Sequence, residues 1–265
     1  MGNPVGSFIW YELMTSDPEA AHAFYNSVVG WTIGASEMPA GGIDYRMIQR
    51  TDGGNAGGVL ALTDEMIGGG AKPGWLGYIY VPDVDAEVAS IVADGGTVQL
   101  PPITLDGVGR MAMVSDPLGA AFYVMTPQPP ADVEDATSEV FTVDRPQTVR
   151  WNELVSPDDD AAVAFYTRHF GWTQEGAMPM GPLGDYRFLQ LEGVGIGAVM
   201  KKAEFMQGGW TFYVGVDDID RALKAARTAG ATAHGEPQQI PGGEFTIHLT
   251  DPQGAFLGLV GPRKG

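Results

Sequence analysis

The sequence predicts an α+β protein built from four βαβββ modules, two in each half of the chain. Two observations support this prediction. Motifs of the first half recur in the second half at a constant spacing, and within each half one strand, one helix and three strands follow one another twice. The chain is also rich in turn formers, with 38 Gly and 19 Pro among 265 residues, which is typical of many short elements.

The internal repeat can be followed motif by motif. The stretch from Trp10 to Thr32 recurs 141 residues later as Trp151 to Thr173, with the same W-x-E-L opening and the same Phe-Tyr pair. The D-P-x-G segments that begin at Asp116 and Asp251 match at an offset of 135 residues. The chain therefore consists of two homologous halves.

The domain boundaries are placed where the repeat ends. The first domain is expected over residues 1–126 and the second over residues 149–265. The segment between them, 127–148, begins Pro-rich, continues with five acidic residues and has no helical apolar period. We predict that this segment is an extended linker.

The first module opens with an apolar, β-rich strand over residues 8–15. Asp17 is a helix N-cap, and Pro18 suits the first helical position. Apolar residues then recur at helical spacing until Gly30 ends the helix. The remaining strands are expected from Trp31 and over 45–49 and 59–62, with a turn at 53–55.

The second module restarts at Trp75 in the same order. A strand over 75–81 precedes a helix over 85–94, which the pair Gly95-Gly96 ends. Its three further strands are expected near 97–100, 110–115 and 121–126. The second half of the chain repeats both modules.

The composition excludes several classes of function. The chain contains no Cys, which removes disulfides, thiolate nucleophiles and zinc fingers. Its net charge is −18, from 15 Lys and Arg against 33 Asp and Glu, so we expect no nucleic-acid partner. No apolar run approaches the roughly 18 residues that a membrane span needs. We expect a cytoplasmic protein whose partner is a small molecule.

Three paired elements carry a resemblance to a known family: Asp17 to Trp31 with Asp158 to Trp172, Val81 to Asp85 with Val216 to Asp220, and Asp116 to Ala120 with Asp251 to Ala255. Together they resemble the vicinal oxygen chelate superfamily of glyoxalase I, bleomycin-resistance proteins and extradiol dioxygenases. The paired W-x-E-L openings without His are similar to its two-domain glyoxalase-like subgroup. The resemblance implies two glyoxalase-like domains in which paired modules curve their mixed sheets into a cup. A duplicated chain can provide by itself the pairing that one-half relatives achieve as dimers, so a monomer is preferred.

The resemblance also implies where a metal ion would be held, and the sequence departs from it. The first-strand His of the metal-binding relatives is replaced by Trp10 and Trp151, and indole is not a metal ligand. The other four ligand positions hold Leu76, Thr211, Tyr123 and Gly258. We therefore expect no metal and no other cofactor, with a divalent ion near His248 as the alternative.

The first strand of each half presents the candidate catalytic residues. Alternation along the strand places Trp10, Glu12 and Met14 on one face, as it does Trp151 and Glu153 in the second half. A carboxylate between Trp and an aliphatic residue is partly desolvated, which makes it a candidate general base or acid. The alternative is that both glutamates only fix the sheet, through hydrogen bonds or through Arg partners of the D-Y-R motifs.

Aromatic residues and one His complete the predicted binding surface. A planar or cationic ligand could stack on aromatic side chains, for which core packing is the alternative. His248 shares the non-apolar face of its strand with two Thr residues and is either a ligand contact or scaffold. The substrate-binding candidates are Trp10, Met14, Tyr45, Trp75, Trp151, Tyr186, Trp210 and His248.

Two functions follow from these residues. The first is metal-independent binding of a small organic molecule between aromatic walls, as the bleomycin-resistance resemblance implies. The second is a glyoxalase-like lyase or isomerase in which Glu12 or Glu153 moves a proton, with or without a divalent ion. A fold shared by lyases, oxygenases and sequestering proteins does not choose between them.

Overall fold

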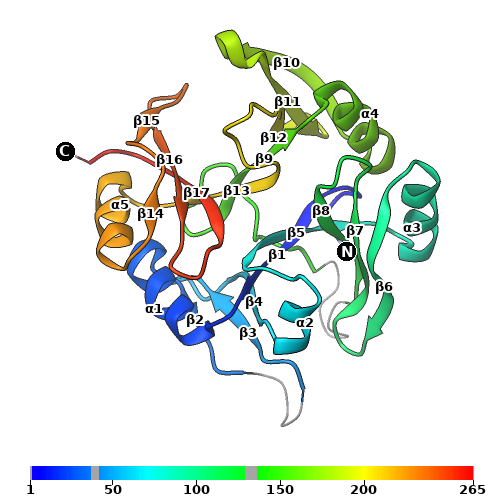
Figure 1. The fold of residues 1–265 in the computed structure, drawn as a ribbon, viewed down its shortest axis with the longest axis horizontal. Helices are drawn as coiled ribbons and strands as arrows, with labels where there is room; N and C mark the ends of the chain where they lie inside the picture. Colours follow the sequence, from blue (N-terminus) through cyan, green and yellow to red (C-terminus); the bar gives the residue numbers. More distant parts are fainter. Residues whose placement is uncertain (1, 37–41, 129–135, 265) are drawn as a thin grey trace. The chain divides into compact units, whose positions relative to one another are not determined.

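The structure, a computed structural model, describes residues 2–36, 42–128 and 136–264. The described strands belong to two mixed sheets, and the few helices flank them, so the predicted α+β class is confirmed. The first half contains β1 (Phe8–Thr15), α1 (Pro18–Val29), β2 (Thr32–Ile33), β3 (Tyr45–Gln49), β4 (Asn55–Ala61), α2 (Asp64–Gly68), β5 (Gly74–Tyr80), α3 (Val84–Ala93), β6 (Thr97–Leu105), β7 (Gly109–Ser115) and β8 (Ala121–Pro127). Figure 1 shows these elements in blue to green.

The second half repeats this order with one additional short strand and one 3-10 turn, and without a helix at the position of α2. It contains β9 (Val149–Ser156), α4 (Asp159–Phe170), β10 (Thr173–Pro179), the 3-10 turn Gly181–Leu183, β11 (Asp185–Leu191), β12 (Val194–Lys201), β13 (Gly209–Gly215), α5 (Ile219–Thr228), β14 (Thr232–Ala233), β15 (Gln238–Gln239), β16 (Phe245–Thr250) and β17 (Phe256–Gly261). None of the helices in the described part of the chain is both long and apolar enough to cross a membrane.

All four modules have the same strand order. In each, the first strand lies beside the fourth, which gives β2-β3-β4-β1, β6-β7-β8-β5, β10-β11-β12-β9 and β14-β16-β17-β13. The first and fourth strands are parallel, as in β1 with β4 and β13 with β17, because the helix between strands carries the chain across. The other neighbours are antiparallel, as in β3 with β4 and β16 with β17.

The helices begin and end where the sequence predicts. Asp17 accepts a hydrogen bond from the Ala20 amide at 2.9 Å, and Gly30 has the left-handed φ of 87° that ends α1. Asp158 and Gly171 do the same for α4 in the second half. One helix escaped prediction. The stretch Asp64–Gly68 forms α2, capped by the Thr63 side chain, and it is too short for an apolar period to reveal it.

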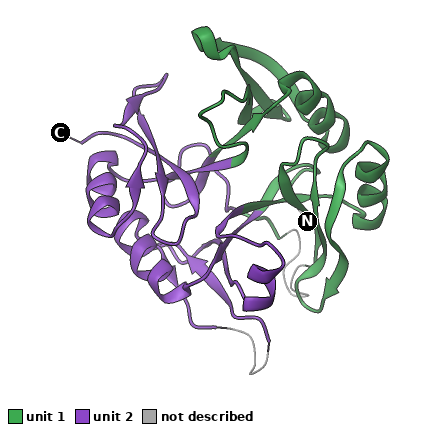
Figure 2. Ribbon diagram, in the orientation of Figure 1, with its two compact units in different colours: residues 1–9, 76–138, 151–210 green, residues 10–75, 139–150, 211–265 purple. Residues whose placement is uncertain are grey.

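The described chain divides into two compact units, each with one module from each half (Figure 2). Unit 1 comprises residues 1–9, 76–138 and 151–210, and unit 2 comprises residues 10–75, 139–150 and 211–265. In unit 2, α1 packs against α5, and in unit 1, α3 packs against α4 (Figure 1). The boundaries expected for two sequential domains stay a prediction.

A buried hydrogen-bonded chain joins the two modules of each unit. In unit 2, the Trp75 indole donates to the Tyr25 hydroxyl at 3.1 Å, which donates to Asp251 at 2.9 Å. In unit 1, Trp210, Tyr166 and Asp116 form the same chain at 3.0 and 3.2 Å. Each Asp belongs to a D-P-x-G motif and each Tyr to a Phe-Tyr motif of the other half, so these motifs connect modules of different halves.

The two buried aspartates imply a pH dependence of stability. Burial raises the pKa of Asp116 and Asp251 above the ordinary value of 3.8. A raised carboxyl pKa means that the folded protein holds these protons more tightly than the unfolded chain. Their contribution to the free energy of unfolding is therefore complete below pH 3.8 and is lost as the pH rises through the folded pKa.

Urea unfolding at a series of pH values checks this sign. The free energy of unfolding of the wild type minus that of the Asp116→Asn/Asp251→Asn double variant should decrease as the pH rises above 3.8. A difference that increases with pH would contradict the prediction. The Asp106→Asn variant, which changes an exposed turn residue, is the control and should leave the pH profile parallel to that of the wild type.

The segment predicted as a linker is in part an integral piece of unit 2. Residues 129–135 lie outside the described residues, but 139–150 pack within unit 2. Val140 is 2% exposed, and the Gln147 amide donates to the Gly215 carbonyl at 2.8 Å. Since a free linker would leave such groups solvated, the second part of the segment acts as a strap of unit 2.

Candidate functional site

The first strand of each half has the predicted alternation. On β1, Tyr11 and Leu13 are completely buried, whereas Trp10 and Met14 on the opposite face are half-buried. Glu12 lies on that same face and is only 3% exposed. The carboxylate is therefore held in a largely desolvated position beside two residues that remain partly accessible.

In unit 1, the predicted residues of the second half form a connected chain. The Trp151 indole donates to the Tyr186 hydroxyl at 2.7 Å, and this hydroxyl donates to the Glu153 carboxylate at 2.8 Å. Burial raises the pKa of Tyr186 well above its ordinary value, and the charge of Glu153 raises it further. Tyr186 therefore remains a protonated donor, and Glu153, which is 7% exposed, receives a directed hydrogen bond.

Small residues on the intervening strand make this chain possible. β12 lies between β11, which carries Tyr186, and β9, which carries Trp151 and Glu153. Its Ala198 stands in register with Glu153, and a Cβ on Gly195 would lie 3.6 Å from the Trp151 ring. Larger side chains there would occupy the space over which the aromatic residues meet.

In unit 2, the first half has the corresponding Trp–Tyr pair. The Trp10 indole donates to the Tyr45 hydroxyl at 2.7 Å. Gly58 of β4 stands in register with Glu12, and a Cβ at Gly58 would collide with the Tyr45 ring. The structure thus brings together Trp10 with Tyr45 in unit 2, and Trp151, Tyr186 and Glu153 in unit 1.

The arginines proposed as partners of the two glutamates are engaged elsewhere. Arg46 pairs with Asp44 and Glu19, at 2.9 and 2.6 Å. Arg187 pairs with Asp160 at 2.6 Å and with the neighbouring Asp159 of α4. The D-Y-R motifs therefore hold their strands to the adjacent helices. The hydrogen bond that the Tyr186 hydroxyl donates positions the Glu153 carboxylate.

Trp75 and Trp210 lie in aromatic clusters and take no part in the Trp10–Tyr45 or Trp151–Tyr186 hydrogen bonds. Trp75 is 7% exposed and packs against Tyr25 and Trp31, with ring centroids 5.5 and 5.8 Å away. Trp210 packs against Tyr166 at 5.1 Å. Core packing, the alternative that the sequence left open, accounts for their positions, and a substrate contact at either Trp stays a prediction.

His248 has a partner that the sequence reasoning missed. On β16 of unit 2, its Nε2 lies 2.6 Å from the hydroxyl of Tyr213 on β13. The repeat could have directed attention to Tyr213, because it corresponds to Tyr78 of the first half, but spacing alone does not show which strands a side chain spans.

The residues at the superfamily's metal-ligand positions do not fit a metal ion. Trp151 uses its only polar atom to donate to Tyr186, and the space above Gly258 is filled by the Tyr213 ring. Leu76 offers no ligand atom, and Thr211 is a poor substitute for His. Among the described residues, no group of three or more His, Asp or Glu is arranged to hold a metal ion.

Two surface pockets are lined by residues other than Trp10, Tyr45, Trp151, Tyr186 and Glu153. One in unit 1, of about 280 Å³, is lined by residues that include Asp116, Ser156 and Lys202. One in unit 2, of about 330 Å³, lies between the C-terminus of α1 and the strap, beside Gln147 and Arg221. Trp151, Tyr186 and Glu153 line neither pocket. They are the candidate site because they join a buried carboxylate to directed donors.

Comparison with known proteins agrees with this architecture. The sequence profile described as Glyoxalase/Bleomycin resistance protein/Dioxygenase superfamily matches residues 7–124 and again residues 147–259. CFP32 of Mycobacterium tuberculosis, which carries the provisional name glyoxylase, is 33% identical over 96% of this chain and 94% of its own. The anthracycline biosynthesis protein DnrV of Streptomyces peucetius is 29% identical over 98% of this chain and 94% of its own.

Solved structures with low sequence identity share the fold. The Mn(II)-bound glyoxalase of Novosphingobium aromaticivorans has a TM-score of 0.62 at 17% identity, over 98% of this chain and 83% of its own. The 2,2',3-trihydroxybiphenyl 1,2-dioxygenase of Sphingomonas wittichii has a TM-score of 0.64 at 13% identity, over 97% of this chain and 90% of its own. Together with the two profile matches and the four βαβββ modules, this confirms the predicted resemblance: the chain belongs to the Glyoxalase/Bleomycin resistance protein/Dioxygenase superfamily.

Proposed function

We propose that the chain binds a small organic molecule on the sheet face that carries the Trp–Tyr pairs, without a metal ion. The observation that carries the proposal is the chain from Trp151 through Tyr186 to Glu153. It combines aromatic surface with a buried, directed carboxylate, a combination suited to a flat ligand with a polar edge. The similarity to an anthracycline biosynthesis protein supports a polycyclic aromatic ligand class.

Quenching of intrinsic Trp fluorescence by doxorubicin tests the binding. We expect saturable quenching by the wild type and a Kd about five- to tenfold weaker in Tyr186→Phe, since loss of one directed hydrogen bond costs about 1 kcal/mol. Tyr45→Phe, the same change in the first half, is the matched variant and shows which half binds. An equal Kd in all three proteins, or no saturable quenching, would refute the proposal.

Proton transfer by Glu153 is the second candidate function. It is favoured by the 2.8 Å bond from Tyr186, which orients a carboxylate that is 7% exposed. A glyoxalase-like reaction needs one group to remove a proton from carbon and return it to the neighbouring carbon. The similarity to CFP32 makes the hemithioacetal of methylglyoxal and glutathione the first substrate to assay.

The assay is made with purified protein whose metal content has been measured, before and after addition of Ni or Zn. We expect turnover by metal-free wild type to fall at least 100-fold in Glu153→Gln, because Gln cannot accept a proton. Glu12→Gln is the matched change in the other half. Unchanged turnover in both variants would exclude proton transfer by these glutamates, and stoichiometric metal bound at His248 would replace the metal-independent account.

A further inference from the structure

A pair of polar side chains in unit 2, outside the Trp–Tyr–Glu chain, has the geometry of a ligand-binding pair. Tyr213 of β13, Gly258 of β17 and His248 of β16 stand in register across three adjacent strands. A Cβ at Gly258 would collide with the Tyr213 ring, so this ring lies directly over the glycine. The absence of a side chain at Gly258 is therefore what lets the Tyr213 hydroxyl reach His248 Nε2, at 2.6 Å.

The surroundings of the pair are aromatic and partly accessible. The His248 ring lies nearly parallel to Phe256, at an angle of 25° and a centroid distance of 5.2 Å. His248, Phe256 and the neighbouring Thr246 and Thr250 are all half-buried, so this face is neither sealed in the core nor open to bulk water. Such a face favours the edge of a flat ring over a small hydrated ion.

The corresponding strands of the first half show that the sheet does not need this pair. There the three matching positions hold Tyr78, Tyr123 and Met113. Tyr78 and Tyr123 stack at 4.1 Å with an interplanar angle of 8°. The same three strands are thus built with an aromatic stack and no imidazole. The second half has Gly258 in place of Tyr123 and His248 in place of Met113. The glycine leaves room for the Tyr213 ring, and the histidine places an imidazole beside the Tyr213 hydroxyl.

We propose that Tyr213 and His248 bind the hydroxyl group of a phenol or enol ligand. This inference deepens the proposed function and rests on it. The ligand hydroxyl donates its proton to the Tyr213 oxygen as the Tyr213 proton passes to His248 Nε2, which leaves a phenolate or enolate beside an imidazolium. The net charge of −18 disfavours ligands that arrive as anions, so a neutral hydroxyl that ionises after binding suits this chain.

Binding of 4-nitrophenol tests the inference, because its ionised form absorbs near 400 nm. At a pH where the free probe is mostly protonated, the wild type should bind it and increase this absorbance. Tyr213→Phe and His248→Met, the latter introducing the residue of the first half, should weaken binding at least tenfold and abolish the increase. Tyr78→Phe, the matched change in the first half, should leave both unchanged.

Further measurements distinguish loss of binding from misfolding and from failure of the proposed function. Far-UV circular dichroism and Tm are measured on each variant, and the ¹⁵N shift of His248 Nε2 in the wild type and in Tyr213→Phe reports the hydrogen bond directly. Equal 4-nitrophenol binding by His248→Met and wild type, or no absorbance increase in the wild type, would overturn the inference. In that case, doxorubicin quenching that still weakens in Tyr186→Phe would leave the proposed function intact, whereas quenching that does not saturate in any of the proteins would refute the proposed function itself.

Discussion

Replacing Asp251 by Ala should lower the free energy of unfolding by about 3–5 kcal/mol, because several buried donors lose their acceptor at once. The carboxylate accepts from the Gln253 and Ala255 amides, at 2.9 and 2.8 Å, and from the Tyr25 hydroxyl at 2.9 Å. Asp251 is 4% exposed and Tyr25 is completely buried, so water cannot readily replace the carboxylate. Urea unfolding followed by circular dichroism measures the change.

Tyr25→Phe separates the two parts of this effect. It removes the hydroxyl that joins the Trp75 indole to Asp251 but keeps the turn that Asp251 holds, so the loss should be about 1–2 kcal/mol. The same changes at Asp116 and Tyr166 should behave alike, since unit 1 has the same chain. The control is Asp106→Ala, an exposed turn position that should stay within about 0.5 kcal/mol of wild type. An Asp251→Ala variant equal to this control would show that the buried chain is not a stabilising element.

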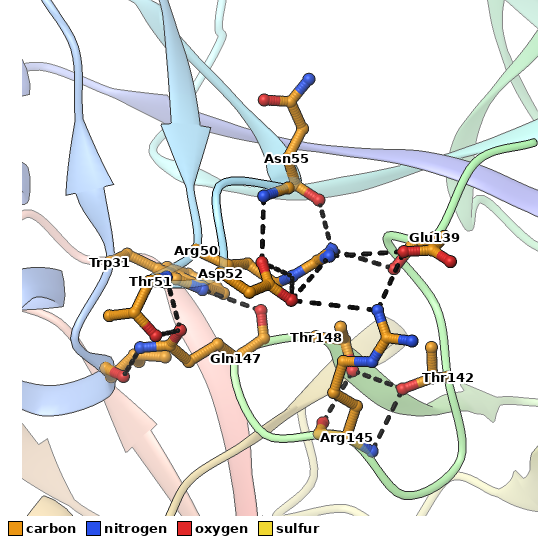
Figure 3. Close-up of polar contacts among 12 residues, drawn as sticks. Trp31, Arg50, Thr51, Asp52, Asn55, Glu139, Thr142, Arg145, Gln147 and Thr148 are labelled. Carbon is orange, nitrogen blue, oxygen red and sulfur yellow. Dashed lines mark hydrogen bonds and ion pairs between the residues drawn. The ribbon is translucent and has the colours of Figure 1, made fainter.

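Replacing Arg50 by Leu should release the strap from unit 2. The Arg50 side chain is 3% exposed and donates to Asp52 at 3.0 Å, to the Asn55 carbonyl at 2.8 Å and to the Glu139 carbonyl at 3.2 Å (Figure 3). Arg145 extends this network by pairing with Glu139 at 2.9 Å (Figure 3). We expect a loss of about 1–3 kcal/mol of unfolding free energy and faster proteolysis within 139–150.

The second half supplies the reason for choosing Leu at this position. Its matching residue, 141 positions later, is Leu191, which is buried and ends β11 just before a shorter turn to β12. Leu is therefore tolerated before the shorter turn, whereas Arg50 joins its own longer loop, through Asp52 and Asn55, to the strap at Glu139. Limited proteolysis with peptide mapping checks this. If Arg50→Leu unfolds at lower urea but is cut in 139–150 no faster than wild type, Arg50 stabilises the hairpin only.

A second contact anchors the same strap independently of charge. The Gln147 side chain accepts from the Thr51 amide at 2.9 Å and donates to the Val29 carbonyl at 3.0 Å, while the Trp31 indole donates to the Gln147 carbonyl at 2.9 Å (Figure 3). Gln147 itself has a φ of 65°, which is unusual for a residue other than glycine. The strap is therefore fixed at several points, so Arg50→Leu should loosen it without abolishing folding.

Most of the secondary structure could be predicted because its signals are local. The Asp17 cap, the Gly30 stop and the alternation along β1 depend only on residues a few positions apart. The candidate residues Trp10, Glu12 and Glu153 were found in the same way. The hydrogen bonds of Trp10 with Tyr45 and of Glu153 with Tyr186 could not be predicted. Each Tyr reaches its partner across an intervening strand, and the small residues that allow this are recognised only once the strands are paired.

Residue spacing and the family resemblance predict the repeated modules, the face of each first strand that carries Trp and Glu, and the replacement of the superfamily's metal ligands. Long-range contacts were needed to show which modules share a compact unit, that residues 139–150 are a strap, and that His248 meets Tyr213. This is because periodicity reports which face of an element is apolar but not what covers it. The four modules have similar apolar faces, so periodicity does not show which two modules pack together. Long-range contacts such as the hydrogen bond between Tyr25 and Asp251, 226 residues apart, specify the pairing.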